Sequence, residues 1–361
     1  MNYEGRIEKV RGALDSSGVD ALLVMNLTNV RYLTGFAGTN GQVLVTRDRT
    51  VFLSDPRYEA RAGAMVRAVE IHIYATRLTE DLPELLTGVT RLGLEGATVT
   101  LAQRDSLAEA LEGIELVTTK DIVEQLRRSK EPDEAALIRD AVRITDDAFA
   151  WILDRLGPGR TEREVALDLE VQMRRSGAEA VAFEPIVGSG ELSAHIHHTP
   201  SDRVMQTGDL VLLDFGCSVE GYCSDLTRTV VLGAGTDEQR DLYATVLRAQ
   251  SAGIGAVRAG AAGAACDAAA REVIEAAGHG THFGHGLGHG VGLDVHEAPR
   301  LHRISEDELT EGDVVTVEPG IYIQGAGGVR IEDCVLVTGD GGEVLGKAPK
   351  DELIEIGGAR R

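Results

Sequence analysis

Residues 210–232 read LVLLDFGCSVEGYCSDLTRTVVL, with two apolar stretches on either side of Glu220 and Gly221. Both stretches are rich in the aliphatic and β-branched residues that are typical of strands. The polar residue and the glycine between them mark a turn. The segment is therefore predicted to form a β-hairpin, and its polar residues are the first candidates for a site.

Asp214 and Asp225 lie at equal distances from a point between Val219 and Glu220. If the loop is centred there, the two carboxylates face each other across the hairpin, with Cβ atoms roughly 4.5–5.5 Å apart. Two opposed carboxylates in an apolar hairpin repel each other unless a positive charge lies between them. A divalent cation would supply that charge, and so would the nearby Arg228. Val-Glu is not a favoured two-residue turn, so a longer or bulged loop is the alternative.

Residues 314–337, VVTVEPGIYIQGAGGVRIEDCVLV, repeat this construction. Glu318 and Glu332 lie symmetrically about Gly325 in a glycine-rich turn, so a second hairpin would set a second pair of carboxylates face to face. One such pair means little in an acidic chain. Two pairs on two apolar hairpins indicate a cation site.

Residues 284–297, GHGLGHGVGLDVHE, lie in the region that holds nine of the ten histidines. Glycine occupies every even position up to 292, so an extended chain would carry side chains on one face and bare backbone on the other. His285 and His289 share the side-chain face, whereas His296 has the opposite parity. A glycine-rich phosphate loop is the alternative, but the segment lacks G-x-G-x-x-G and a following Lys-Ser/Thr. We interpret four other histidines as core or surface residues without a role in the site: His195, His279, His282 and His302.

One imidazole with four carboxylates is a hard, oxygen-rich ligand set that suits Mn²⁺ or Co²⁺, with Fe²⁺ and Zn²⁺ as alternatives. Five ligands exceed the needs of one ion. They suit two ions roughly 3.5–4 Å apart that share a bridging hydroxide, an arrangement used for hydrolysis. Cys223 lies two residues before Asp225 and is interpreted as a neighbour of the site, not as a ligand.

The chain has 361 residues, and its 58 acidic residues against 36 Lys and Arg give a formal net charge of −22. Nucleic acids and anionic membranes are polyanions, so neither is expected as a partner. No apolar stretch approaches the roughly 18 residues of a membrane span, and the start MNYEGRIEKVRGAL lacks a signal-peptide core, so we expect a cytoplasmic protein. The four cysteines form no C-x-x-C pair, which predicts reduced and mostly buried thiols.

The length indicates about two domains at roughly 150 residues each, with a boundary near 120–130. The first 125 residues alternate apolar runs with amphipathic stretches, which predicts a small α/β domain. A charged helical stretch follows from 121 to about 155, with Pro132 at a first-turn position. Strands are expected at 20–25, 42–46, 50–53, 71–74, 91–94, 114–117, 182–187, 209–217, 221–232, 313–318 and 328–338. Helices are expected at 3–17, 56–67, 78–86, 101–112, 161–175, 236–256 and 263–276.

The motifs DFG…YCSDLTRT, GHGLGHGVGLDVHE, TVEPGIY and GGVRIED resemble, in this order, the M24 metallopeptidases. Within them the chain is similar to the aminopeptidase P and prolidase branch. The stretches ALLVMNLTNVRYLTGFAGTNG (21–41) and FLSDPRY (52–58) resemble the creatinase-type N-terminal domain of that branch. The resemblance implies an α/β creatinase-like domain over residues 1–125 and an α+β catalytic domain with the pita-bread fold over residues 126–361.

The resemblance also implies a set of metal ligands. Asp225 and Glu332 would bridge two divalent ions, usually manganese or cobalt, while Asp214 would hold one ion and His289 with Glu318 the other. Glu318 would also carry a proton from the bridging water to the leaving prolyl nitrogen.

Five further residues match positions near the substrate in this branch. His197 matches a histidine that contacts the substrate. His285 and His296 match the pair that flanks the metal histidine, with His296 placed to stabilise an oxyanion. Arg330 would orient the carboxylates behind the ligands. Arg300 occupies a position where some prolidases bind the free carboxylate of a dipeptide.

The activity implied is hydrolysis of the bond between an N-terminal residue and a following proline, as in aminopeptidase P. The alternative is a prolidase that acts on dipeptides, which Arg300 favours slightly. A non-hydrolytic binding module and a creatinase are disfavoured because all five ligand positions carry competent residues. A methionine aminopeptidase is disfavoured by the N-terminal α/β domain. Proline-containing peptides are the expected substrates, and the branch implies a homodimer or homotetramer.

Overall fold

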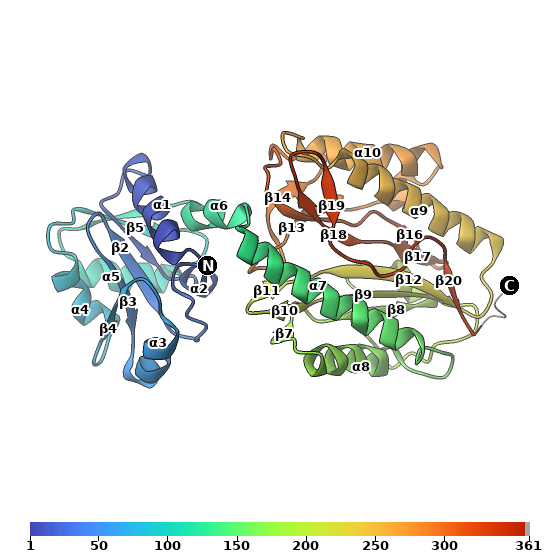
Figure 1. Cartoon of the computed structure of the whole chain (residues 1–361), viewed down its shortest axis with the longest axis horizontal. Coiled ribbons are helices and arrows are strands. Elements are labelled where there is room, and N and C mark those ends of the chain that lie inside the picture. The colour runs from blue at the N-terminus through green and yellow to red at the C-terminus, as the bar shows by residue number, and fades with distance from the viewer. Residues whose placement is uncertain (358–361) are drawn as a thin grey trace. The chain divides into compact units, whose positions relative to one another are not determined.

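The computed structural model describes residues 1–357, which fall into two units, Met1–Arg127 and a second that begins at Arg128 (Figure 1). Each unit has its own sheets and its own buried apolar residues. Among the described residues, no helix combines the length and the apolar character that crossing a membrane requires.

The first unit is built on one six-stranded mixed sheet with the order β4-β3-β2-β1-β5-β6. Its central strands are buried throughout, as their apolar sequences predict. The expected α/β domain is confirmed. Its strands are β1 (Ala21–Val24), β2 (Gln42–Thr46), β3 (Thr50–Ser54), β4 (Glu70–Ile73), β5 (Arg91–Glu95) and β6 (Glu115–Thr119). Its helices are α1 (Tyr3–Ser16), α2 (Leu27–Thr34), η1 (Pro56–Tyr58), α3 (Glu59–Met65), α4 (Leu78–Leu85) and α5 (Leu101–Ala110).

Helix α2 is absent from the sequence-based prediction, although both of its ends carry recognisable signals. The Asn26 side chain accepts hydrogen bonds from the backbone N–H groups of Thr28 and Asn29, as an N-cap does. At the other end Gly35 adopts a left-handed conformation with φ of 79°. The helix has only eight residues, so its apolar spacing is too short to stand out.

The charged stretch after the first sheet forms two helices, α6 (Ile122–Arg128) and α7 (Pro132–Leu153). Pro132 occupies the first turn of α7, as predicted. Glu131, the residue before it, is extended with φ −65° and ψ 157°. A residue before proline is disfavoured in the helical region, which accounts for the break between the two helices.

In the second unit, helices flank several small sheets (Figure 1). One core joins α9 and α10 to the strands of the chain's last third, and another joins α7 and α8 to the four-stranded sheet β20-β12-β9-β8. The helices are α8 (Glu162–Arg175), η2 (Gly190–Ala194), α9 (Asp237–Ala256), α10 (Gly263–Ala276) and η3 (Gly280–His282). The strands up to β14 are β7 (Ala180–Val181), β8 (Ile186–Ser189), β9 (Leu210–Phe215), β10 (Cys217–Val219), β11 (Tyr222–Cys223), β12 (Leu226–Leu232), β13 (Gly288–Gly290) and β14 (Glu297–Leu301). The remaining strands are β15 (Val314–Val317), β16 (Gly320–Ile323), β17 (Gly327–Arg330), β18 (Asp333–Val337), β19 (Gly342–Val344) and β20 (Ile354–Ile356).

The first predicted hairpin forms, but its turn lies one residue later than expected. Glu220 and Gly221 are the two turn residues, with φ of 45° and 81°, and positive φ at both positions is typical of a type I′ turn. The register therefore sets Asp214 opposite Thr227. The expectation that Asp214 faces Asp225 directly is wrong. Asp225 lies two residues before Thr227 and so is a diagonal neighbour of Asp214, since side chains two apart along a strand share a face.

The second hairpin has the predicted register. β15 pairs with β18 with Val317 opposite Asp333, and β16 pairs with β17 in the same register beyond them. Glu318 and Glu332 are the next pair in that ladder, so their predicted opposition is confirmed. They lie where the hairpin leaves the five-stranded sheet β14-β13-β15-β18-β19 and enters the two-stranded one.

The glycine-alternating segment is a strand only at β13, which pairs with both β14 and β15. A Cβ atom on Gly288 would lie 2.0 Å from the Thr316 carbonyl oxygen, and one on Gly290 would lie 2.2 Å from that of Ala298. Such contacts are too short for any side chain, so the bare face of β13 is occupied by neighbouring backbone, as the alternation predicts.

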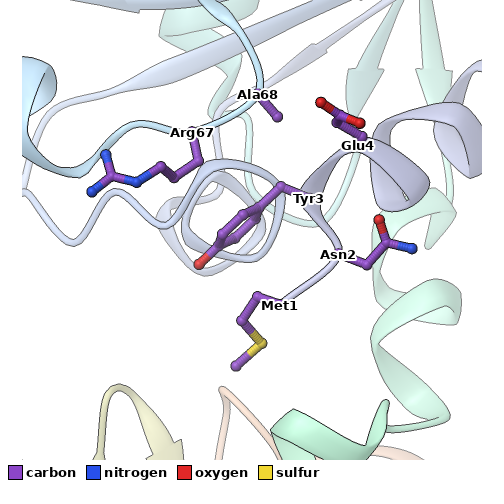
Figure 2. A pocket seen from close by; sticks show the side chains of 6 residues that line it. All are labelled: Met1, Asn2, Tyr3, Glu4, Arg67 and Ala68. Atoms are coloured by element: carbon purple, nitrogen blue, oxygen red, sulfur yellow. The ribbon is translucent and has the colours of Figure 1, made fainter.

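All four cysteines are buried and free, which confirms the expectation of reduced thiols. An open pocket of about 560 Å³ lies at the start of the chain (Figure 2). Glu4 is the one acidic residue in its lining and no histidine is present, so its chemistry differs from that of the predicted metal site. The lining residues are Met1, Asn2, Tyr3, Glu4, Arg67 and Ala68.

Candidate metal centre

The five predicted metal ligands come from the strands at the centre of the second unit or from residues at their ends. Four of them are carboxylates held in buried or half-buried positions, where water cannot solvate their charge. The ligands are Asp214 in β9, Asp225 before β12, His289 in β13, Glu318 after β15 and Glu332 after β17.

The fold brings four of these side chains within reach of one another. One ligand atom each from Asp225, His289 and Glu332 lies within 4.8 Å of the others. The Nε2 atom of His289 is 3.7 Å from Asp225 Oδ2 and 3.4 Å from Glu318 Oε1. These spacings exceed hydrogen-bond length and leave room for an ion between the donor atoms.

Asp214 gives a separate indication that this site binds a cation. Its Oδ2 atom accepts a hydrogen bond from the Nη2 group of Arg330. Its Oδ1 atom is buried and has no hydrogen-bond partner among the described residues. A buried carboxylate oxygen without a partner is costly, and a metal ion is a ligand that would satisfy it. The donor set therefore fits divalent metal.

The pKa shifts agree with this crowding of negative charge. Burial raises the pKa of Glu318 to about 7, against the opposing effect of Arg330. Burial also raises the pKa of Asp225 well above its usual value, with Glu332 and Asp214 adding to the shift. The pKa of Glu332 is raised in the same way. One guanidinium cannot balance four carboxylates, so the cluster needs protons or cations to be stable.

His289 is oriented so that one ring nitrogen faces the carboxylates. Its Nδ1 atom lies 3.0 Å from the Gly290 carbonyl oxygen, which fixes the proton on Nδ1 and leaves the Nε2 lone pair free. Burial lowers the pKa of this histidine, so the neutral ring is favoured. Its backbone N–H donates to Thr316 Oγ1, 3.1 Å away. A neutral imidazole fixed through its other nitrogen is the form that binds metal.

Thr227 supports two charged groups of the site and was not identified from the sequence. Its hydroxyl donates to Glu332 Oε2 at 2.7 Å and accepts from Arg330 Nε at 2.9 Å. Thr227 lies two residues after Asp225, so the sequence does place both side chains on one face of the hairpin. Predicting that Thr227 lies opposite Asp214 requires the correct centre of the turn.

Arg330 and His285 are joined through Tyr322, another residue that was not predicted from the sequence. Arg330 Nη1 donates to the Tyr322 hydroxyl at 2.9 Å, and that hydroxyl lies 2.9 Å from His285 Nε2. His285 Nδ1 bonds to the Gly286 carbonyl oxygen, so the tyrosine hydroxyl donates to Nε2. Burial lowers the pKa of His285 to about 3, and Arg330 adds to the effect. His285 is therefore a neutral acceptor behind the ligands.

The remaining predicted residues are exposed. The His296 ring lies with its centroid 4.3 Å from that of His289. Arg300 is opposite His289 in the register of β13 and β14, and directly paired residues project from the same face. His197 lies in a turn after η2, and its charge is among those that lower the pKa of Glu318. Each of these three exposed groups is thus linked by a contact, by strand register or by its charge to His289 or Glu318.

Comparison with known proteins covers both units. Residues 6–129 match the creatinase/prolidase N-terminal domain. Residues 136–339 match metallopeptidase family M24, which is more than half of the chain. The two matches follow each other in the order that the sequence motifs predict.

Several relatives are similar over nearly the full length. A Xaa-Pro dipeptidase from Pyrococcus furiosus is 35% identical over 351 residues, covering 96% of this chain and 99% of that protein. The solved structure of a Xaa-Pro dipeptidase from Bacillus anthracis has a TM-score of 0.96 and 42% identity, covering 98% of this chain and 100% of that one. The solved structure of the X-Pro aminopeptidase from Thermotoga maritima MSB8 has a TM-score of 0.89 and 34% identity, covering 95% of this chain and 99% of that one.

Proposed function

The chain belongs to metallopeptidase family M24, and on that premise we propose that it is a dinuclear Xaa-Pro dipeptidase. Membership confirms the resemblance drawn from the motifs and the expected fold, a creatinase-type domain followed by a pita-bread domain. In this proposal residues 126–361 form the catalytic domain and residues 1–125 the N-terminal one. The similarity to Xaa-Pro dipeptidases supports the prolidase alternative more directly than the prediction of an aminopeptidase P.

The observation that carries the proposal is the buried cluster with the unpartnered Asp214 oxygen. Membership of the family implies divalent metal ions, and we propose two Mn²⁺ ions from the oxygen-rich donor set. Asp214, Asp225, His289, Glu318 and Glu332 would hold these ions. When bound, such ions act as Lewis acids toward a carbonyl oxygen and lower the pKa of water.

The chain's own residues would move the protons. Glu318 lies beside the metal-site histidine, with its Oε1 atom 3.4 Å from His289 Nε2, so its carboxyl group is placed to carry a proton at the bond that is cleaved. A prolyl amide nitrogen carries no hydrogen, and it must receive a proton as the peptide bond breaks. Glu318 is therefore proposed to deliver that proton, while Thr316 Oγ1, 3.3 Å from Glu318 Oε1, orients its carboxyl group.

The exposed residues would bind the substrate. His296 would donate a hydrogen bond to the oxyanion of the scissile carbonyl, and His197 would contact the peptide. Arg300 would pair with the free carboxylate of a dipeptide, since a guanidinium binds a carboxylate through two parallel hydrogen bonds. Arg330 would keep Asp214 and Glu332 oriented behind the ions. We also propose a homodimer or homotetramer, as the resemblance implies.

Cleavage of three peptides by the Mn²⁺-loaded full-length enzyme tests the proposal. Ala-Pro should be cleaved, whereas Ala-Pro-Ala and Ala-Ala-Ala should not. Cleavage of Ala-Pro-Ala would favour the aminopeptidase reading, which the similarity to the Thermotoga maritima enzyme supports. Cleavage of all three peptides would refute selectivity for proline.

A further inference from the structure

Strand β14 and the residue before it carry two of the three groups proposed to meet the substrate. Arg300 lies within it, opposite the metal-site histidine His289, and His296 immediately precedes its first residue, Glu297. Arg300 is exposed, and its guanidinium has no hydrogen-bond partner among residues 1–357. The backbone of β14 therefore sets the position of Arg300. Two basic residues far away in sequence are linked to this strand, Lys130 directly through Glu297 and Arg128 through Asp307.

Lys130 holds the first residue of β14. Its Nζ atom is 2.6 Å from Glu297 Oε1 and 2.8 Å from the Arg128 carbonyl oxygen, and the lysine side chain is 0% exposed. The Glu297 carboxylate also lies against the backbone two residues after β13, because a Cβ atom on Gly292 would be 2.4 Å from Glu297 Oε1. The ion pair thus fixes Glu297 in a dry, close-packed place.

Arg128 holds the loop that follows β14. Its Nε atom is 3.2 Å and its Nη2 atom 2.9 Å from Asp313 Oδ2, and Nη2 also donates to the Glu308 carbonyl oxygen. Asp313 is fully buried and accepts from the N–H and the hydroxyl of Thr310. Residues 308–313 are therefore tied together around one guanidinium.

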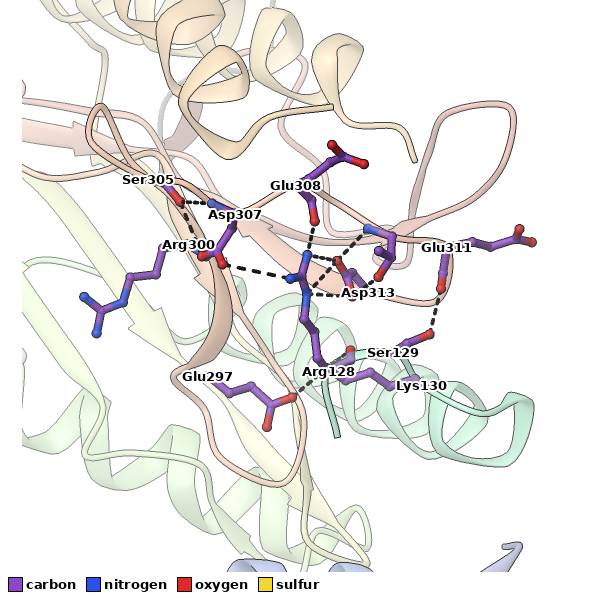
Figure 3. Close-up of polar contacts among 11 residues, drawn as sticks. Arg128, Ser129, Lys130, Glu297, Arg300, Ser305, Asp307, Glu308, Glu311 and Asp313 are labelled. Carbon is purple, nitrogen blue, oxygen red and sulfur yellow. Dashed lines mark hydrogen bonds and ion pairs between the residues drawn. The ribbon is translucent and has the colours of Figure 1, made fainter. Parts of the chain in front are cut away.

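Asp307 connects this loop to Arg300. Its Oδ2 atom accepts from the Arg300 N–H at 2.8 Å and from the Ser305 hydroxyl at 3.3 Å. Its Oδ1 atom lies 3.9 Å from Arg128 Nη1. Figure 3 shows this network reaching the backbone of Arg300, while the Arg300 guanidinium extends away from it.

We propose that Arg128 and Lys130 are positioning residues for substrate recognition. By holding Asp307 and Glu297 they fix β14 at both ends, and so fix where Arg300 presents its guanidinium to the carboxylate of a dipeptide. The proposal rests on the function proposed above. It assigns a specificity-setting role to the end of α6 and the short segment that follows it.

The test compares Ala-Pro with Ala-Pro amide, which lacks the free carboxylate, in the Mn²⁺-loaded full-length enzyme. Arg300→Ala calibrates the assay and should raise KM for Ala-Pro by about tenfold, leaving the amide within about twofold. Lys130→Met and Asp307→Asn should each raise KM for Ala-Pro about three- to tenfold, again without affecting the amide. The matched control Arg139→Ala breaks an exposed ion pair with Glu343 and should change neither substrate.

The outcomes separate the two proposals. If Lys130→Met and Asp307→Asn shift KM for both substrates equally, or only lower the folded fraction, the positioning role is overturned. If Arg300→Ala leaves Ala-Pro unaffected, the carboxylate role of Arg300 in the proposed function fails and the positioning role fails with it. Asp307 is partly exposed, at 33%, so Asp307→Asn decides the question even where Lys130→Met does not fold.

Discussion

Replacing Thr227 by valine removes one hydroxyl and keeps nearly the same shape, so it tests how the ligands are held. The hydroxyl is fully buried and bonds to Glu332 at 2.7 Å and to Arg330 at 2.9 Å. Each hydrogen bond to a charged group contributes about 1.5–3 kcal/mol, so the two together set an upper limit of about 6 kcal/mol. Arg330 keeps its bonds to Asp214 and Tyr322, so we expect Thr227→Val to lower the free energy of unfolding by about 2–3 kcal/mol.

The same substitution should weaken metal binding, because Glu332 loses the group that orients it. Removing a residue that hydrogen-bonds to a metal ligand typically lowers the metal affinity by about 10–100-fold. Calorimetric titration of the metal-free protein with Mn²⁺ measures the affinity, and denaturant unfolding measures the stability.

Thr229→Val is the matched control, two residues along the same strand. The Thr229 hydroxyl is equally buried but bonds only to the backbone of Arg330, donating to its carbonyl oxygen and accepting from its N–H at 3.1 Å each. Thr229→Val should lower the free energy of unfolding by about 1–2 kcal/mol and keep the Mn²⁺ affinity within about twofold of the wild type. Equal Mn²⁺ affinities for the two variants would refute the role of Thr227 in holding Glu332.

Two further predictions concern the metal and the pH dependence. A chelator should abolish cleavage of Ala-Pro and Mn²⁺ should restore it, and His289→Ala should lose most metal and turnover; full activity without metal, or in that variant, would contradict the ligand assignment. In the metal-free protein the pKa of Glu318 is about 7 against an ordinary 4.5, so the folded state binds the extra proton. Its contribution to stability is therefore present at low pH and is lost as the pH rises from about 4.5 to about 7. Denaturant unfolding of the wild type and of Glu318→Gln across that range measures how the free energy of unfolding of each depends on pH. If the two proteins show the same dependence, Glu318 does not titrate in this way.

Local patterns predicted most of the elements, because apolar periodicity and turn residues act over a few neighbouring positions. The second hairpin shows how far this extends, since a symmetric ladder around Gly325 was enough to set Glu318 opposite Glu332. The first hairpin shows the limit. Its turn settled on Glu220 and Gly221, where a left-handed glycine fits a type I′ turn, and that one-residue shift moved Asp225 from opposite Asp214 to a diagonal position.

The sequence by itself determined the ligand types, the two hairpins and the glycine-alternating strand, since each is written in one continuous segment. Tertiary structure alone decided which contacts hold them in place. Arg330 reaches Asp214 across 116 residues, and Lys130 reaches Glu297 across 167. Such pairs leave no local pattern, because they depend on how separate elements pack and on which buried charges then need a partner.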